Sequence, residues 1–341
     1  MYNYDNPTGS ANYVNVNNTT GQNLSALDAQ VKANADTLND KTHNIKYYSI
    51  SDNAPTLGFD SYSNAGNDGA KGNGSLAAGF VTHADGIAST VVGSYSGVMN
   101  KGTALGPLGL DYRGATAVSL GTVNVNNNTD TSKPYSGVAN SIVGQANMTT
   151  NSNAAIIYGA GNTVTDSYRP INDKKAAGIL VSISDPTKLS EAMQNAVKDS
   201  GGQVMVMGGG NNVESAYMSQ VVGVGNTVKG NQVENTKGEW GTDTSDTAIK
   251  DYNSEKSSQY NYVDGFSNEV INGKHDYVIG ANNTVTGDSY DDKDAKKYSN
   301  ESNIIFGDNH TVTNTKNAVI IGSSDTPVSY THLTLPTRQV V

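Results

Sequence analysis

Short runs of apolar residues, each ended by a glycine, recur from Ser75 onward along most of the chain. Where no insert intervenes, the glycines are evenly spaced: Gly79 and Gly93 are 14 residues apart, and Gly144 and Gly159 are 15 apart. Each run predicts a short β-strand, and a fixed period is typical of a solenoid. The runs end at Gly79, Gly93, Gly121, Gly144, Gly159, Gly208, Gly223, Gly280, Gly307 and Gly322, Gly265 is a degenerate member, and Gly106 precedes Gly121 by a further 15 residues.

A second feature follows many of these glycines: Asn stands three residues on and Val five residues on, as in GAGNTV (159–164) and GANNTV (280–285). Because Asn tolerates the positive φ angle of a tight turn, we interpret this Asn as a turn residue and the Val as the centre of a second strand. One repeat is thus predicted to be a coil of two strands and two turns. A coil this small buries too little apolar surface to offset the conformational entropy that its backbone loses on folding. We therefore expect stacking on neighbouring coils and packing against identical chains to stabilise it.

Near the N-terminus the apolar positions recur every seven residues. They are Leu24, Val31, Leu38 and Ile45, with Leu27, Asn34 and Lys41 at the complementary heptad positions. This pattern predicts a coiled-coil stalk helix over 21–46, and the alternative is a single amphipathic helix packed on a domain. Residues 1–20 are then the end of a preceding segment or a linker.

The repeats extend over 47–326, with inserts near 165–203, 230–261 and 287–302. In the first insert, Asp185 and Pro186 predict the start of a helix that runs through Lys198, because Asp is a favoured N-cap and Pro is favoured in the first turn. The other two inserts are polar and are expected to form loops, which in solenoids often face the binding side.

Composition agrees with thin β-structure and restricts the possible partners. Only 35% of the residues are hydrophobic, with 4 Phe and 1 Trp, which is low for an ordinary globule. The net charge is 22 − 32 = −10 without a basic cluster, so no nucleic acid is expected as a partner. No apolar run approaches the roughly 20 residues that span a bilayer, so direct membrane insertion is not expected either. The lack of Cys excludes disulfides and thiolate sites.

No residue pattern points to catalysis, so we predict no enzyme, no catalytic or cofactor-binding residue and no metal site. The five histidines, none at metal-site spacing, are His43, His83, His275, His310 and His332. The acidic run from Asp288 to Asp294 predicts a solvated loop, with a cation site as the alternative. Several tyrosines lie in polar segments, either as solvent-side strand residues or as adhesive contacts: Tyr252, Tyr260, Tyr262, Tyr290 and Tyr298.

Heptads that lead into glycine-closed repeats resemble the YadA-like head and short stalk of trimeric autotransporter adhesins. The resemblance covers about residues 21–326 and is carried by SLAAGFVTHADGIASTVVGSYSGV (75–98), IIYGAGNTVTDS (156–167) and AVIIGSSDT (318–326). It implies a left-handed parallel β-roll, an obligate homotrimer and display outside the cell, anchored to the outer membrane in the parent protein. It also implies attachment to host matrix proteins, to receptors or glycans of host cells, or to other bacteria. The family's signal, neck motif and barrel anchor are not visible in this sequence.

Two other functions fit a repetitive β-protein: a phage tail fibre, and a β-helix enzyme that degrades polysaccharides. Such an enzyme needs paired carboxylates or basic residues on adjacent coils, where these repeats carry Asn and Thr. The segment VSYTHLTLPT (328–337) resembles a translated sequencing adapter. We therefore expect residues 327–341 to be a non-native tail.

Overall fold

The computed structural model describes residues 13–15, 17–39, 69–100, 111–130, 136–167, 181–182, 184–198, 202–230, 258–288 and 299–324. The chain divides into two compact units, Met1–Asn53 and Ala54–Val341, and each is described by itself. Predictions for residues 40–46, for most of the last two inserts and for the tail at 327–341 fall outside the described residues.

The described residues of the first unit include the helix α1 (Thr20–Asn39), which overlaps the segment that the heptads predict. Thr19 and Gln22 form a reciprocal cap, in which the Thr19 N–H donates to Gln22 Oε1 (2.8 Å) and the Gln22 N–H to Thr19 Oγ1 (3.3 Å). The apolar heptad residues Leu24 and Val31 are 62% and 67% exposed. The helix therefore presents an uncovered apolar seam, and whether partner chains cover it stays a prediction.

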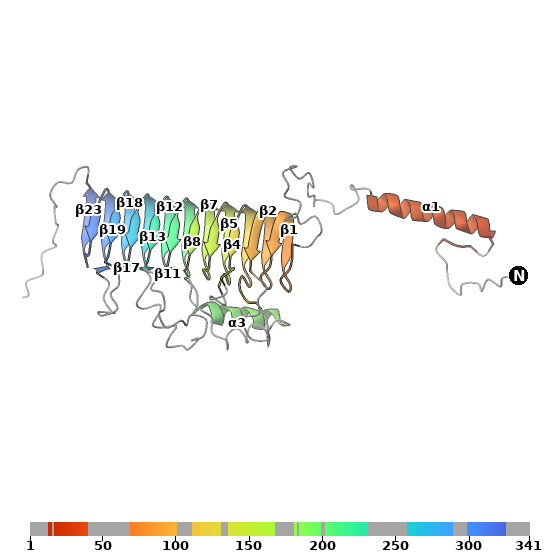
Figure 1. Ribbon diagram of the computed structural model, residues 1–341, viewed down its shortest axis with the longest axis horizontal. Helices are drawn as coiled ribbons and strands as arrows, with labels where there is room; N and C mark the ends of the chain where they lie inside the picture. Colours follow the sequence, from red (N-terminus) through yellow and green to blue (C-terminus); the bar gives the residue numbers. More distant parts are fainter. Residues whose placement is uncertain are drawn as a thin grey trace, which may run out of the picture. The chain divides into compact units, whose positions relative to one another are not determined.

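The second unit is mainly β, and its strands form a large parallel sheet wound into stacked coils (Figure 1). The first strand of each coil is β1 (Leu76–Ala84), β2 (Thr90–Met99), β3 (Val118–Thr122), β5 (Ser141–Gln145), β7 (Ile156–Ala160), β9 (Met205–Gly209), β12 (Gln220–Val224), β15 (Tyr262–Phe266), β18 (Tyr277–Ala281), β21 (Ile304–Asp308) and β23 (Val319–Ser323). A second strand follows as β4 (Val125–Asn127), β6 (Met148–Thr150), β8 (Thr163–Thr165), β10 (Asn212–Glu214), β13 (Thr227–Lys229), β16 (Glu269–Ile271), β19 (Thr284–Thr286) and β22 (Thr311–Thr313). The predicted glycine-closed strands and their parallel stacking are confirmed.

The prediction of two turns per coil is wrong, because a third corner is present already in the coil that starts at β5, at Ala154, and the later coils add a third short strand. The third strands form a separate parallel sheet of β11 (Ala216–Tyr217), β14 (Ser258–Gln259), β17 (Gly273–Lys274) and β20 (Asn300–Glu301). In the coil that starts at β15, a residue with positive φ marks each corner: Ser267 (52°), Asn272 (53°) and His275 (57°). Each third strand is only two residues long, and all but β11 consist of polar residues or glycine, so no apolar run predicts them.

The glycines that close the first strands stand in one row, each beside the glycine of the next coil. The degenerate member Gly265 belongs to this row, between Gly223 and Gly280. Gly106 lies outside the described residues, and Gly121 pairs directly with Gly93. The 15-residue spacing from Gly106 to Gly121 therefore does not describe a coil, and the chain between β2 and β3 is a further insert.

The interior holds one β-branched residue from each of the two longer strands of a coil, such as Val206 and Val213. A continuous apolar cluster built this way runs from Ile142 to Val312. A smaller cluster at the first coils includes Val91. Between the two, the core positions of β3, β4 and β6 hold the buried polar residues Ser119, Asn126 and Thr149. Because this interior is so thin, buried hydrogen bonds must contribute much of the order.

The Asn that follows each glycine is a buried bridge between coils. From Asn211, the Nδ2 group donates to Asn162 Oδ1 of the preceding coil (2.9 Å) and to the Gly223 carbonyl of the next coil (2.8 Å). Its backbone N–H also donates to Asn162 Oδ1 (3.1 Å). Both amide protons and the oxygen of each such side chain are thereby used inside the protein, as buried polar groups require.

The same bonds repeat through a ladder of buried asparagines: Asn124, Asn147, Asn162, Asn211, Asn226, Asn268 and Asn283. Ser96 Oγ ends the ladder on one side by accepting the Asn124 N–H (3.1 Å). At the other end His310 takes the place of Asn. Its backbone N–H donates to Asn283 Oδ1 (3.0 Å), and its ring Nε2 lies 2.7 Å from the Gly322 carbonyl oxygen.

The interpretation of this Asn as a turn residue is therefore wrong. The positive φ angles lie one residue earlier, at Gly161 (69°), Gly225 (67°) and Asn282 (55°). The ladder Asn itself has an ordinary backbone conformation and points inward. The amide is selected because a carboxylate or hydroxyl lacks the two donors and one acceptor that the position needs.

The predicted helix in the first insert is present as α3 (Pro186–Lys198). Asp185 Oδ1 accepts the N–H groups of Thr187 (2.9 Å) and Lys188 (3.2 Å), which confirms the Asp as N-cap. The insert leaves the coils after Ser167 and returns at Gly202, whose N–H donates to the Ser167 carbonyl (3.1 Å).

We expect Gly208→Ala to be far more destabilising than Gly161→Ala, although both glycines have positive φ. A Cβ at Gly208 would overlap the Gly223 carbonyl oxygen, whereas the nearest atom to a Cβ at Gly161 is 3.8 Å away. The first change should cost about 4 kcal/mol or more and the second about 1–2 kcal/mol. Urea unfolding measures both, and equal costs would contradict the close coil-to-coil approach.

The neighbouring residues Asn282 and Asn283 provide a matched pair for the ladder. Asn283→Ala removes bonds to Asn268 (2.8 Å) and to the Gly307 carbonyl (2.8 Å) and leaves their buried groups unsatisfied. It should lower the free energy of unfolding by about 3 kcal/mol or more, whereas Asn282→Ala, at an exposed corner, should cost about 1 kcal/mol. If Asn282→Ala proves the costlier change in urea unfolding, the ladder is not the stabilising element.

Candidate interaction surface

The outward side of the first strands carries apolar residues along the length of the coils. Side chains alternate along each five-residue strand, so the second residue points into the core while the first, third and fifth residues point outward. The exposed apolar residues on this side are Leu76, Val92, Leu120, Ile156, Tyr158, Met207, Val224, Phe266, Tyr277, Ile304, Phe306, Val319 and Ile321. We call this set the outward apolar face.

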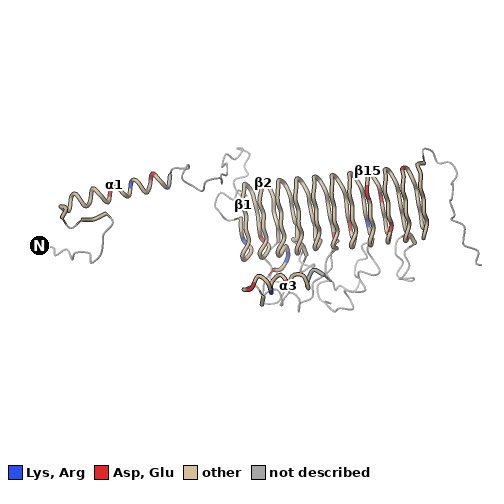
Figure 2. The backbone as a smooth tube through the Cα atoms, turned by 180° about the vertical axis from the view of Figure 1, so that it is seen from behind, with Lys and Arg blue, Asp and Glu red and all other residues tan. Residues whose placement is uncertain are grey.

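The outward apolar face consists of rows rather than scattered residues. Tyr158 pairs with Met207 across β7 and β9, and Tyr277 pairs with Ile304 across β18 and β21. Tyr158 is 60% exposed, and Phe306 is 55% exposed. Charged residues are sparse along the coils (Figure 2). A continuous apolar surface of this kind is rare on monomeric proteins and marks an interaction site.

Two carboxylates, Asp264 and Asp308, interrupt the face, and that of Asp264 is partly paired. The Tyr262 hydroxyl donates to Asp264 Oδ2 (3.3 Å), and the Tyr262 and Tyr277 rings lie 6.3 Å apart. Burial and the Asp264 charge raise the pKa of Tyr262 above its ordinary value. Both tyrosines therefore belong to the outward side of the strands, and the predicted use of Tyr262 as an insert contact does not fit its position on β15.

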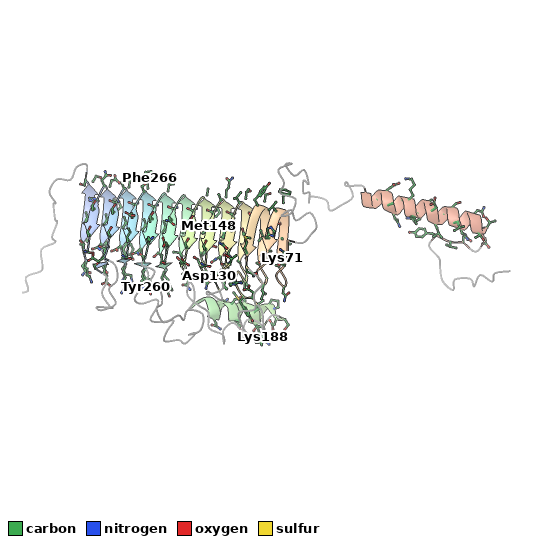
Figure 3. All side chains as sticks on the ribbon, in the orientation of Figure 1. Lys71, Asp130, Met148, Lys188, Tyr260 and Phe266 are labelled. Atoms are coloured by element: carbon green, nitrogen blue, oxygen red, sulfur yellow. The ribbon has the colours of Figure 1, made fainter. Side chains whose placement is uncertain are left out.

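A second, polar surface lies along the third strands. Lys274 and Lys316 each lie beside Glu301, at 3.4 Å and 3.7 Å. At the adjoining corner the Tyr260 ring stacks on His275, with centroids 4.8 Å apart and planes at 29°. Tyr260 and Phe266 lie at opposite edges of the coils (Figure 3). The two surfaces therefore occupy different sides of the same coils.

A shorter ladder beneath the third strands contains a buried carboxylate, Asp276. Its Oδ1 accepts the Asn303 N–H (3.0 Å) and Nδ2 (2.9 Å), and its Oδ2 accepts Asn300 Nδ2 (2.8 Å). Burial raises the pKa of Asp276 to about 6, the bonds from Asn303 and Asn300 oppose this shift, and the Glu301 charge adds to it. Asn261 and Asn303 occupy the equivalent position in the two neighbouring coils, so an uncharged amide is the usual side chain at this position of the shorter ladder.

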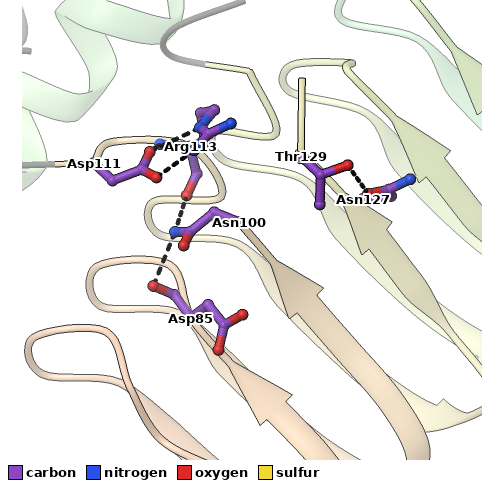
Figure 4. A network of polar contacts seen from close by, with 6 residues as sticks. All are labelled: Asp85, Asn100, Asp111, Arg113, Asn127 and Thr129. Carbon is purple, nitrogen blue, oxygen red and sulfur yellow. Dashed lines mark hydrogen bonds and ion pairs between the residues drawn. The ribbon is translucent and has the colours of Figure 1, made fainter. Parts of the chain in front are cut away.

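The first coils contain a buried ion pair, shown in Figure 4. Arg113 is fully buried and donates through Nε (2.9 Å) and Nη2 (2.6 Å) to the Asp111 carboxylate. Asn100 Nδ2 donates to the carbonyls of Asp85 (3.0 Å) and Arg113 (3.1 Å). Burial raises the pKa of the Asp85 carboxyl. With no exposed guanidinium atom, this network serves to join coils rather than to receive a ligand from solvent.

The structure places three of the five histidines separately. His83 lies on β1, His275 at a corner beside Tyr260, and His310 at the end of the asparagine ladder. His43 and His332 lie outside the described residues, as do Asp291, Asp292 and Asp294 of the acidic run. Asp288 is exposed, and its N–H donates to Ser299 Oγ (2.6 Å). Tyr252, Tyr290 and Tyr298 also lie outside the described residues.

Within the part of the chain that the structure describes, no three His, Asp or Glu side chains gather in a group that would suit a metal ion. Neither described helix combines the length and apolarity needed to cross a bilayer. Comparisons with known proteins return no match: no family model, no curated protein and no solved structure is significantly similar to the chain. Function must therefore be inferred from the surfaces themselves.

Asp276 predicts an unusual pH dependence. Its pKa is raised from 3.8 to about 6 in the folded state, so the folded protein binds the proton more tightly than the unfolded chain. The stability that this group contributes is full below pH 3.8 and falls as the pH rises through 6, by about 3 kcal/mol in total.

Asp276→Asn should remove this pH-dependent loss of stability, because an amide does not titrate. The Asn300 side-chain amide then turns its oxygen toward the NH₂ group that the substitution introduces. The gain in unfolding free energy over the unmodified protein should grow between pH 4 and pH 7, as measured by urea unfolding. Glu269→Gln, at a half-buried carboxylate on β16, is the control and should show no such growth. A gain of equal size at both pH values would argue against a raised Asp276 pKa.

Proposed function

We propose that the chain is the head of a trimeric, non-enzymatic adhesin displayed at a bacterial cell surface. The outward apolar face carries this proposal. Its rows of exposed Tyr, Phe, Ile and Met side chains run the length of the coils, and identical chains that pack along a shared axis would bury them continuously. A single coil of 14–15 residues has little interior of its own, so this burial would add to its stability.

Three further features support the proposal. The apolar seam of α1 is exposed, as a helix that awaits coiled-coil partners would be. The inserts leave the coils next to the third strands, as at Ser167 and Gly202. The resemblance of the repeats to YadA-like heads adds the left-handed winding, the surface location and the binding of host matrix proteins, receptors or glycans.

Sedimentation equilibrium tests the trimer. The expected mass is three times the chain mass of 35.6 kDa. Tyr158→Lys combined with Met207→Lys places two charges in adjacent coils of the outward apolar face and should yield monomers or aggregates. The matched control is Thr163→Lys with Asn212→Lys, a paired position on the second strands, which should remain trimeric.

Adhesion is tested with beads that carry the trimer on collagen, fibronectin and cultured host cells. Retention of trimer-coated beads, and loss of retention with the monomeric variant, is the expected result. A folded monomer without the lysine substitutions would contradict the assembly. Exclusive binding to bacterial lipopolysaccharide would favour the tail-fibre alternative, and release of reducing ends from polysaccharides would favour the enzyme.

A further inference from the structure

The third corner of the coils carries an aromatic stack that stops abruptly. In consecutive coils this corner holds Tyr260, His275, Ser302 and Asn317, all with positive φ between 54° and 60°. Each N–H donates to the carbonyl one coil back, for example from His275 to Gln259 (2.9 Å) and from Ser302 to Lys274 (2.8 Å). The four side chains therefore occupy equivalent places along one edge.

The rings continue the spacing of the coils. Tyr260 and His275 stack with centroids 4.8 Å apart, which is about the distance between adjacent strands. Tyr217, from the preceding coil, meets Tyr260 edge to face at 5.7 Å. Ser302 follows in place of a third ring. His275 is exposed and contacts no second ring among the described residues. The face of its ring that points away from Tyr260 is therefore not covered by a ring. We call the place beside this face, at the corner of Ser302, the step.

Polar groups surround this step. No described group hydrogen-bonds to the Ser302 hydroxyl or to the Asn317 side-chain amide. Beside them lie the Glu301 carboxylate and the Lys316 ammonium, which are 3.7 Å apart. The step thus has a hydroxyl and a side-chain amide next to one flat aromatic face, and the Glu301–Lys316 ion pair stands one residue before each of them in the sequence.

We propose that this step is a glycan-binding subsite in which a pyranose ring stacks on His275. A pyranose has an apolar C–H face of about the size of an imidazole or phenol ring and a rim of hydroxyls, and this combination matches an apolar wall with a few convergent polar groups. The sugar ring takes the place of the missing third ring. Ser302, Asn317 and Glu301 hydrogen-bond its hydroxyls. The proposal rests on the adhesive function and assigns a ligand class to one place on the head.

Ser302→Tyr is the sharpest test, because it fills the step with a ring. Tyr260 and His275 show that ring side chains are accommodated at this corner, so the variant should fold. The matched control is Ala154→Tyr, which adds the same ring at a corner with φ of 51° several coils away. His275→Ala removes the stacking face itself.

The unmodified protein is applied to a printed array of galactose-, glucose-, fucose- and sialic acid-terminated oligosaccharides. The strongest-binding free oligosaccharide is then titrated by saturation-transfer NMR against every variant. Ser302→Tyr and His275→Ala should each weaken binding at least tenfold, Ala154→Tyr should leave it unchanged, and saturation should concentrate on the sugar C–H protons.

Three outcomes overturn the proposal: an array without signal, binding that survives both Ser302→Tyr and His275→Ala, or equal loss with Ala154→Tyr. Sedimentation and bead retention on the same samples separate it from the wider function. Intact trimers that still retain beads on collagen without binding any glycan refute the subsite alone, whereas monomers that bind glycan refute the trimeric head alone.

Discussion

The row of buried asparagines is the interaction on which the rest of the structure depends. From Asn147 onward each side chain donates to the Asn of the coil behind it and to the glycine carbonyl of the coil ahead, as Asn226 does with Asn211 (3.1 Å) and Gly265 (3.0 Å). Because the Asn-to-Asn and Asn-to-glycine bonds cross coil boundaries, the ladder holds neighbouring coils together. A slip of one residue would turn the asparagines outward and leave the glycine carbonyls unpaired, so the ladder also fixes the register.

The glycine row is the steric counterpart of the ladder. The ladder Asn donates its Nδ2 proton to the carbonyl of a row glycine. This carbonyl oxygen also lies against the row glycine of the neighbouring coil, so that neighbouring position has no room for a Cβ. The coils are also thin, because from β3 onward each longer strand has only three to five residues and sends one side chain into the interior. The remaining apolar residues of the strands must then point outward. The outward apolar face is therefore a direct consequence of how the coils stack.

The chain pattern predicts much of this architecture because its main signals are local. The glycine-closed runs give the strands, the even spacing gives the stacking, and Asp185 with Pro186 gives α3. The degenerate Gly265 also falls into the row. These features depend on residue types whose preference is strong and whose position in the repeat is constant.

Other features depend on contacts that the pattern does not contain. Asn suits both a left-handed corner and a buried ladder, so GANNTV alone does not show that Asn282 takes the first role and Asn283 the second. Ser96 and His310 end the ladder without resembling its members. The stack of Tyr217, Tyr260 and His275 joins residues that an insert separates in sequence, and the third strands have no apolar signature. A search for Asn at a constant distance from each repeat glycine, tested for burial as well as for turn geometry, is the signal that would have found the ladder.

Hydrogen exchange of the asparagine amides, followed by NMR, tests the ladder most directly. If the ladder holds the coils together, the backbone N–H and side-chain NH₂ groups of Asn162, Asn211, Asn226 and Asn268 should exchange only through global unfolding, all at nearly the same slow rate. The side-chain amide of the exposed Asn317 provides the reference for rapid exchange. Ladder amides that exchange as fast as Asn317 would contradict the claim that these bonds hold the coils together.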